Sequence, residues 1–441
     1  MSEASFAFVN PGDKFLEHRG DRPPLGLAYL SSYVKSLRQN SRIWDLNHHK
    51  EAEFMKYALD DQPQFVCYSV ATPNYNDVLR QARDLKAAGY RGKIIAGGQH
   101  VTALPFERPT LDTFDHVVVG EGENALMQLI HGEESKVILS TPIENIDTLP
   151  MPDREGLQLD RYTMKLRGKK ATTAVSSRGC VYRCRFCGSA KRTYESKQTN
   201  KEKAIGKNEW RSHSPKRVAG ELDEIVRRFD KSAVYYGDDI FTFNRARTMK
   251  IAEEIGTRDY RDDLTLRVTT RVDLVDLKML KALAKIGVDV ISFGFESGNE
   301  EILKRIDKGG KATNLKAHRD ARRACREAGI AVKGFFIVGH PGETMDTARD
   351  TIRFAKELDL EYADVYPWTP YPASPFWDNP SQGQEGMDYV RPEGDWDKYY
   401  QVGAGGKMNI LIKHPNLTSE QILQLIDEFH QEVGKKGLTY D

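Results

Sequence analysis

Short apolar runs alternate with amphipathic helical patterns over the first 130 residues of the chain. The spacing of apolar residues predicts helices over 25–37, directly after two prolines, and over 75–88. Short apolar strands separated by helices are typical of a parallel sheet that is covered on both faces. We therefore predict that residues 1–140 form an α/β domain with a doubly wound, Rossmann-like parallel sheet. Its five predicted strands cover residues 5–9, 42–46, 65–70, 93–96 and 116–119.

A second series of β-α units follows a proline-rich segment. Residues 141–154 contain three prolines and little periodicity, so we interpret 141–165 as the linker between two domains. Six further strands with helices between them predict a partial TIM-type (β/α)6 barrel over 166–378. Residues 379–441 are predicted to form a small extension with an amphipathic helix over 417–433. The six predicted barrel strands cover residues 172–176, 233–236, 264–269, 288–293, 331–338 and 362–366.

The composition narrows the class of protein further. The chain has 441 residues, more than the roughly 250–300 that one hydrophobic core supports, which agrees with two domains. A formal net charge of +1 gives no reason to expect a specific nucleic-acid partner. No run approaches the ~20 apolar residues of a transmembrane segment, and the N-terminus lacks the regions of a signal peptide. Five cysteines are too few for a disulfide scaffold, so we expect a reducing, cytoplasmic location.

Small residues follow three of the predicted strands in the first domain. Ligands of open α/β sheets bind beyond the carboxyl ends of the strands, where small residues let a flat group approach the backbone. The alternative is that the glycines only turn strands into helices. No G-x-G-x-x-G motif follows the first strand, which argues against a dinucleotide-binding fold. The candidate ligand contacts are Ser69, Ala71, Thr72, Gly97, Gly98, Gly120 and Glu121.

Three of the five cysteines lie together directly after the first predicted barrel strand. Cys180, Cys184 and Cys187 form a C-x-x-x-C-x-x-C sequence, and thiolates so close together repel one another unless a cation or cluster binds them. Three ligands are one short of a closed zinc site, whereas a 4Fe–4S cluster with three cysteines keeps one iron open. A zinc site completed by a distant histidine such as His213 is the alternative. The other two cysteines, Cys67 and Cys325, are interpreted as inert core thiols.

The cysteine spacing, with Phe186 before the last cysteine, resembles the signature of radical S-adenosylmethionine enzymes. The resemblance implies that Cys180, Cys184 and Cys187 are catalytic ligands of a 4Fe–4S cluster. In that family the open iron chelates the amino and carboxylate groups of S-adenosylmethionine. Reductive cleavage then gives a 5′-deoxyadenosyl radical, which abstracts hydrogen from an unactivated position.

The resemblance also implies contacts to S-adenosylmethionine at the carboxyl ends of later barrel strands. Residues 237–239 depart from the family's Gly-Gly-Glu motif, and an acidic helix cap is the alternative for them. A surface ion pair is the alternative for the arginine. The implied contacts are Gly237, Asp238 and Asp239 for the methionyl ammonium, Arg271 for the methionyl carboxylate, Ser292 and Glu296 for the ribose, and Val338 and Gly339 beside the adenine.

The order of the predicted domains is similar to that of radical S-adenosylmethionine enzymes with an N-terminal cobalamin (B12)-binding domain. In such a chain the seven candidate contacts of the first domain would touch cobalamin. The D-x-H-x-x-G motif of other cobalamin proteins is absent, because Asp13 and His18 stand at the wrong spacing. In this class that absence is common, and cobalamin can bind without a protein histidine ligand. Some members keep the domain and bind no cobalamin, which is the alternative for this domain.

The resemblance implies a cobalamin-dependent methyltransferase that acts on an unactivated carbon. Its partners would be a small-molecule, lipid or natural-product substrate and a reductase, flavodoxin or ferredoxin as electron donor. One alternative is a non-methylating radical reaction such as cyclisation, oxidation or carbon–carbon coupling. The other is a non-catalytic metal-binding protein, which would give no reason for polar residues at successive strand ends. A methylthiotransferase is disfavoured because that class carries further N-terminal cysteines.

Overall fold

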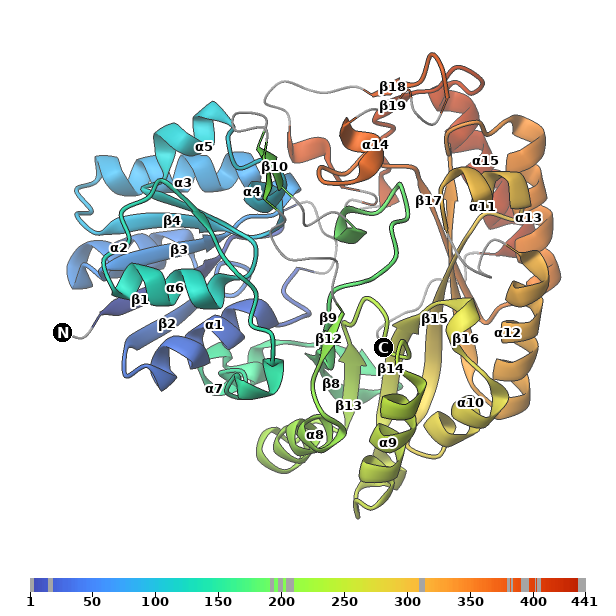
Figure 1. Ribbon diagram of the computed structural model, residues 1–441, viewed down its shortest axis with the longest axis horizontal. Helices are drawn as coiled ribbons and strands as arrows, with labels where there is room; N and C mark the ends of the chain where they lie inside the picture. The colour runs from blue at the N-terminus through green and yellow to red at the C-terminus, as the bar shows by residue number, and fades with distance from the viewer. Residues whose placement is uncertain are drawn as a thin grey trace. The chain divides into compact units, whose positions relative to one another are not determined.

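The computed structural model describes residues 4–14, 19–190, 194–196, 201–203, 210–308, 314–378, 381, 384–389, 396–400, 402 and 406–434. The chain divides by its internal contacts into two compact units, both of α/β architecture (Figure 1). The first unit comprises Met1–Thr163, Arg192–Asn208 and Pro392–Lys407, and the second comprises Met164–Lys191, Glu209–Arg391 and Met408–Asp441.

A six-stranded parallel sheet in the order β2-β1-β3-β4-β5-β6 forms the centre of the first unit. The four residues 6–9 of β1 are at most 1% exposed, because helices cover both faces of the sheet. The order reverses between β1 and β3, so the switch point at which such sheets bind ligands lies at their carboxyl ends. The elements are β1 Ser5–Asn10, α1 Leu25–Ser36, β2 Asn40–Asp45, α2 Glu51–Asp61, β3 Phe65–Ser69, α3 Tyr75–Ala87, β4 Lys93–Gly97, α4 Gln99–Ala103, α5 Arg108–Thr113, β5 His116–Val119, α6 Gly122–Ile130 and β6 Val137–Leu139.

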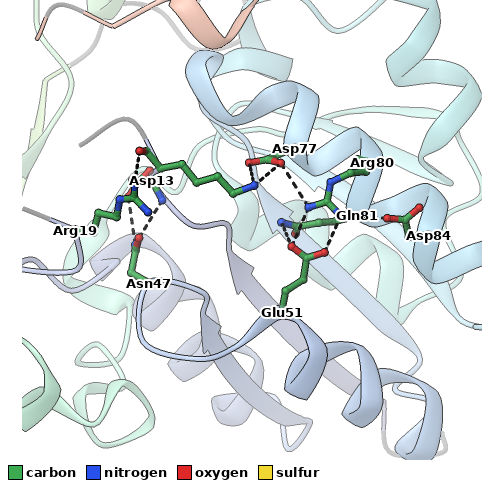
Figure 2. A network of polar contacts seen from close by, with 9 residues as sticks. Asp13, Arg19, Asn47, Glu51, Asp77, Arg80, Gln81 and Asp84 are labelled. Atoms are coloured by element: carbon green, nitrogen blue, oxygen red, sulfur yellow. Dashed lines mark hydrogen bonds and ion pairs between the residues drawn. The ribbon is translucent and has the colours of Figure 1, made fainter. Parts of the chain in front are cut away.

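A polar network connects the loops around this switch point (Figure 2). Arg80 of α3 binds Glu51 at the start of α2 through two parallel contacts of 2.7 and 2.8 Å. Lys14, in the loop after β1, donates to Asp77 in the first turn of α3 at 2.8 Å. The loops that follow β1, β2 and β3 are therefore held to one another by charge-assisted hydrogen bonds.

The second unit contains a seven-stranded sheet in the order β17-β16-β15-β14-β13-β8-β7. Strands β8 to β17 in this order are parallel, and β7 forms an antiparallel hairpin with β8. The six parallel strands are the predicted partial barrel, which the structure confirms. The elements are β7 Lys165–Leu166, β8 Lys169–Ala174, α8 Pro215–Phe229, β13 Ala233–Tyr236, α9 Arg245–Gly256, β14 Thr265–Thr270, α10 Leu277–Ala284, β15 Val288–Glu296, α11 Glu300–Arg305, α12 Leu315–Ala328, β16 Ala331–Val338, α13 Met345–Leu358, β17 Tyr362–Pro367 and α15 Ser419–Val433.

Several short elements complete the two units. Asp153, in the predicted linker, accepts a hydrogen bond from Ser31 of α1 at 2.6 Å, so this segment is attached to the first unit. The remaining helices and strands are α7 Arg154–Leu157, β9 Ser177–Arg178, β10 Tyr194–Ser196, β11 Lys201–Lys203, β12 Arg211–Ser212, α14 Pro375–Asp378, β18 Asp388–Tyr389 and β19 Ile412–Lys413. Among the helices of the described segments, none has the length and apolar composition that crossing a bilayer requires.

The C-terminal region contributes to both units. Helix α15 packs on α13, β16 and β17 in the second unit, where the ring of Phe429 lies 5.3 Å from that of Phe336. Trp396 belongs to the first unit, where its ring lies 5.0 Å from that of His100. The predicted boundaries, 1–140, 141–165, 166–378 and 379–441, stay a prediction.

Candidate functional site

The cysteine loop begins where β8 ends, and a buried carboxylate fixes its start. Asp238, which follows β13, accepts hydrogen bonds from the backbone N–H and the hydroxyl of Ser176, both at 2.8 Å, and from the Ser177 hydroxyl. Burial raises the pKa of Asp238, and these hydrogen bonds act in the opposite direction. Because its carboxylate is engaged in this way, only the backbone of Asp238 is free to serve the predicted cofactor contact.

The three thiols of the loop influence one another electrostatically. Burial is the main reason that the pKa of each thiol is raised, to about 11 for Cys180, and the Cys184 thiolate raises the pKa of Cys180 and Cys187 further. Lys308 and Arg271 lower the pKa of Cys184 and so favour its thiolate. Three thiols beside two buried cations are a donor set that fits an anionic iron–sulfur cluster.

The zinc alternative would require four ligands around one ion. Within the described residues, no three His, Cys, Asp or Glu side chains are arranged around a single metal ion. His213 is buried, and its backbone bonds to Ser176 and to the guanidinium of Arg247. Zinc bound by the three cysteines and His213 stays the alternative prediction.

Arg271, directly after β14, has a different environment from the predicted one. It is 7% exposed, so the surface-ion-pair alternative is wrong. Its Nε and Nη2 bind the carboxylate of Asp273 at 3.0 and 3.3 Å, and the guanidinium lies 3.6 Å from the ring centre of Tyr182. Its Nη1 donates to the Lys308 carbonyl at 2.7 Å and to the Cys184 sulfur at 3.9 Å. Asp273 therefore occupies the Nε–Nη2 edge of the guanidinium, and the pairing of Arg271 with the methionyl carboxylate stays a prediction.

Glu296, at the end of β15, forms a buried ion pair that the sequence did not predict. The Lys308 ammonium lies 2.6 Å from Glu296 Oε1, and both side chains are less than 10% exposed. A Cβ on Gly294 would lie 2.2 Å from the same oxygen, so this glycine makes room for the pair. Lys308 belongs to the charged sequence LKRIDKGGK, which looks like a solvated loop and gave no signal of burial.

The turn after β16 contains two more buried ionisable groups. The backbone N–H groups of Gly339 and His340 donate to Glu343. Burial raises the pKa of Glu343 to about 8 and lowers that of His340 to about 3. The His340 ring lies 6.0 Å from the ring of Phe186, so the turn after β16 contacts the cysteine loop.

Of the other predicted contacts of the barrel, Gly237, Asp239 and Val338 lie at or directly after strand ends, whereas Ser292 lies in the middle of β15. Asp239 is exposed, accepts a hydrogen bond from Ser189 at 3.4 Å and raises the pKa of Cys180. Gly237 is also exposed, and a Cβ there would meet only ordinary contacts at 3.7 Å or more, so packing does not require this glycine. Ser292 and Val338 are buried within β15 and β16.

The glycines at the strand ends of the first unit differ in whether the backbone fold requires them. Gly98 has φ +105°, and a Cβ there would lie 2.7 Å from the backbone of Val70, so turn geometry explains this glycine. Gly120 also has a positive φ, and its N–H donates to Thr102 at 3.1 Å. At Gly97 a Cβ would meet nothing closer than 4.0 Å. Packing therefore does not require a glycine at position 97, and its contact with a ligand stays a prediction.

One remaining candidate, Thr72, contacts a buried histidine that the sequence did not reveal. Thr72 Oγ1 lies 3.2 Å from His100 Nδ1, and Glu107 lies 3.0 Å from His100 Nε2. Ser69 and Ala71 are half-buried beside β3, and Glu121 precedes the first residue of α6. The only cue for His100 was its position directly after Gly97-Gly98-Gln99.

Comparison with known families identifies the class of protein. A model described as the radical SAM superfamily matches residues 174–355, and a model described as the B12 binding domain matches residues 15–130. The chain therefore contains a radical SAM domain, as the cysteine spacing indicated, and a B12-binding domain before it. More particularly, it is a radical S-adenosylmethionine enzyme with an N-terminal cobalamin-binding domain. Its cofactors are accordingly a 4Fe–4S cluster, S-adenosylmethionine and cobalamin.

Individual proteins resemble the chain over most of its length. An uncharacterized methyltransferase of Pyrococcus horikoshii is 29% identical over 428 residues, 92% of this chain and 86% of that protein. The anaerobic magnesium-protoporphyrin IX monomethyl ester cyclase of Cereibacter sphaeroides is 26% identical over 412 residues, 85% of this chain and 63% of that protein. The structure of the radical S-adenosylmethionine methyltransferase TsrM from Kitasatospora setae, with cobalamin and a [4Fe–4S] cluster bound, superposes with a TM-score of 0.73. It shares 16% identity and covers 97% of this chain and 91% of that one, which shows a common fold.

Proposed function

We propose that the protein is a cobalamin-dependent radical methyltransferase that methylates an unactivated carbon of a small organic substrate. The observation that carries the proposal is the presence, in one chain, of a three-cysteine loop beside buried cations and a domain that matches the B12 binding domain. The methyltransferase of Pyrococcus horikoshii and the TsrM fold support it. When bound, the cluster and S-adenosylmethionine supply a 5′-deoxyadenosyl radical, and cobalamin supplies the methyl group.

In this proposal the residues of the barrel bind and orient S-adenosylmethionine. Cys180, Cys184 and Cys187 would hold three irons, while the Gly237 carbonyl and the Asp239 carboxylate would accept hydrogen bonds from the methionyl ammonium. Glu296 would contact the ribose hydroxyls, and its buried ion pair with Lys308 would hold the carboxylate in position. The backbone at Val338 and Gly339, with Phe186 nearby, borders the adenine.

The first unit would bind cobalamin at the carboxyl ends of its strands. Gly97 leaves room for a flat ligand, and Ser69, Ala71 and Thr72 line the neighbouring strand end. Gly98, Gly120 and Glu121 would shape the adjoining turns. An external donor, such as a reductase, flavodoxin or ferredoxin, would supply the electron.

The cluster assignment is tested by anaerobic reconstitution with iron and sulfide. The wild-type protein should gain iron, sulfide and a broad visible absorption, and should cleave S-adenosylmethionine when reduced. Cys184→Ala should lose the cluster and all cleavage, because only two thiolates remain. Cys325→Ala removes a buried thiol from α12 and should keep both. Zinc in place of iron in the wild-type protein, or cleavage by Cys184→Ala, would contradict the proposal.

A non-methylating radical reaction is the second candidate, favoured by the similarity to the ester cyclase of Cereibacter sphaeroides. The two are separated by adding hydroxocobalamin to the reconstituted protein and analysing the products. Cobalamin retention together with S-adenosylhomocysteine formation would support methylation. Formation of 5′-deoxyadenosine without S-adenosylhomocysteine would support the second candidate.

A further inference from the structure

Arg271 donates a hydrogen bond to the sulfur of Cys184, one of the three cysteines that would bind the cluster. Cys184 is the most buried of the three loop cysteines, and its sulfur lies 3.9 Å from Arg271 Nη1. The same nitrogen donates to the Lys308 carbonyl at 2.7 Å, so one of its hydrogens points to the carbonyl and the other to the sulfur. A positive, buried donor therefore faces one cluster ligand.

The surroundings of Arg271 hold its guanidinium in this position. Asp273 binds two of its nitrogens, the Lys308 carbonyl binds the third, and the ring of Tyr182 stacks against its plane at 3.6 Å. Arg271 and Asp273 are each less than 10% exposed, so water screens their charges little. An arginine held from three sides has a fixed orientation toward the sulfur.

A hydrogen bond to a ligand sulfur changes the reduction potential of an iron–sulfur cluster, as do nearby charge and burial. Reduction adds one electron and makes the cluster more negative. A cation beside Cys184 stabilises the reduced form more than the oxidised form and so raises the potential.

We propose that Arg271 is a positioning residue that raises the reduction potential of the 4Fe–4S cluster by donating a hydrogen bond from Nη1 to the Cys184 sulfur. This inference rests on the proposed function, because it requires the cluster. In this proposal Arg271 interacts with a cluster ligand, and residues other than Arg271 bind the methionyl carboxylate.

The test measures the midpoint potential of the reconstituted full-length protein by an EPR-monitored redox titration in the absence of S-adenosylmethionine. Omitting S-adenosylmethionine removes any contribution from binding of its carboxylate. Arg271→Met should shift the one-electron reduction equilibrium at least tenfold toward the oxidised cluster, or about 59 mV to lower potential. Arg271→Lys, which keeps the charge but not the geometry, should give a smaller shift in the same direction.

Two further variants distinguish an effect of charge on the potential from an effect of disrupting the protein structure. Asp273→Asn removes the counter-charge of Arg271 and should raise the potential. Arg267→Met removes another buried arginine from β14, one that pairs with Asp289 instead, and should leave the potential unchanged.

The outcomes distinguish this inference from the proposed function. A wild-type protein without a cluster would overturn both. A wild-type protein with a cluster, and Arg271→Lys and Asp273→Asn variants with unchanged potentials, would overturn only the role of Arg271. If Arg271→Met fails to assemble a cluster, the opposite shifts of the other two variants still decide the question.

Discussion

Several ionisable residues at the barrel strand ends are buried, and each is stabilised by a specific partner. Asp238 accepts hydrogen bonds from two serines, Glu296 pairs with Lys308, and Glu343 accepts two backbone N–H groups. Burying a charge without such partners costs several kcal/mol. At Glu343 the partners offset only part of this cost, because its pKa is raised to about 8.

Glu343 therefore makes the stability of the protein depend on pH. The folded state keeps the Glu343 proton up to a pH of about 8, whereas the unfolded state releases it near its ordinary value of 4.5. Between these values the folded state binds more protons, so stability falls as the pH rises. Glu343→Gln removes this dependence, and its stability relative to the wild-type protein should grow by about 1.4 kcal/mol for each pH unit. Urea unfolding at pH 6 and 7.5 checks this, and an equal difference at both pH values would contradict it.

Loops rather than strands determine what the edge of each sheet presents. In the first unit, the turn from β4 to α4 places two adjacent glycines in different situations. Gly98 has a positive φ and lies against the backbone of Val70, whereas a Cβ on Gly97 would meet only Val118, at 4.0 Å. The network of Arg80 and Lys14 holds the loops on the other side of the switch point (Figure 2).

The two glycines can be compared directly by alanine substitution. Gly98→Ala combines backbone strain with a 2.7 Å contact to Val70 and should destabilise the protein by at least about 2 kcal/mol. Gly97→Ala should change the free energy of unfolding by less than about 1 kcal/mol. Urea denaturation of the two variants checks the difference. Equal stabilities would show that the contact with Val70 does not constrain the turn.

At the scale of the whole molecule, residues that are far from the cysteine loop in the sequence form part of the hydrophobic core behind it. Helix α15 covers α13, β16 and β17, and its apolar face is buried, including Phe429 at 0% exposure. Strand β16 leads directly into the turn that contacts Phe186, so α15 supports the strand behind the site.

Removing the Phe429 ring tests this support. Phe429→Ala should cost about 3–5 kcal/mol, because it leaves a cavity against Phe336. Leu423→Ala on the same helix, where the side chain is 40% exposed, should cost less than about 0.5 kcal/mol. Thermal or urea unfolding of the second unit reports both changes. A small effect of Phe429→Ala would show that α15 packs loosely.

Most strands could be predicted from the sequence because they are short, apolar and buried on both sides. The predicted strands over 233–236 and 331–338 have the bounds of β13 and β16, and the other barrel strands differ by a few residues at their ends. Strand β6 was missed, since it has only three residues at the edge of its sheet. The apolar pattern of a segment is a local property, so it identifies strands whose residues are apolar throughout because both faces are buried.

The sequence by itself determined the two α/β units, the cysteine spacing and hence the class of enzyme, because these depend on residues close together in the chain. Tertiary structure alone decided which charges meet: that Lys308 pairs with Glu296, and that Arg271 faces Asp273 and Cys184. It also placed Trp396 against His100. Such partners come from loops that are separate in the sequence. They become neighbours only when parallel strands bring their carboxyl ends to one edge of the sheet.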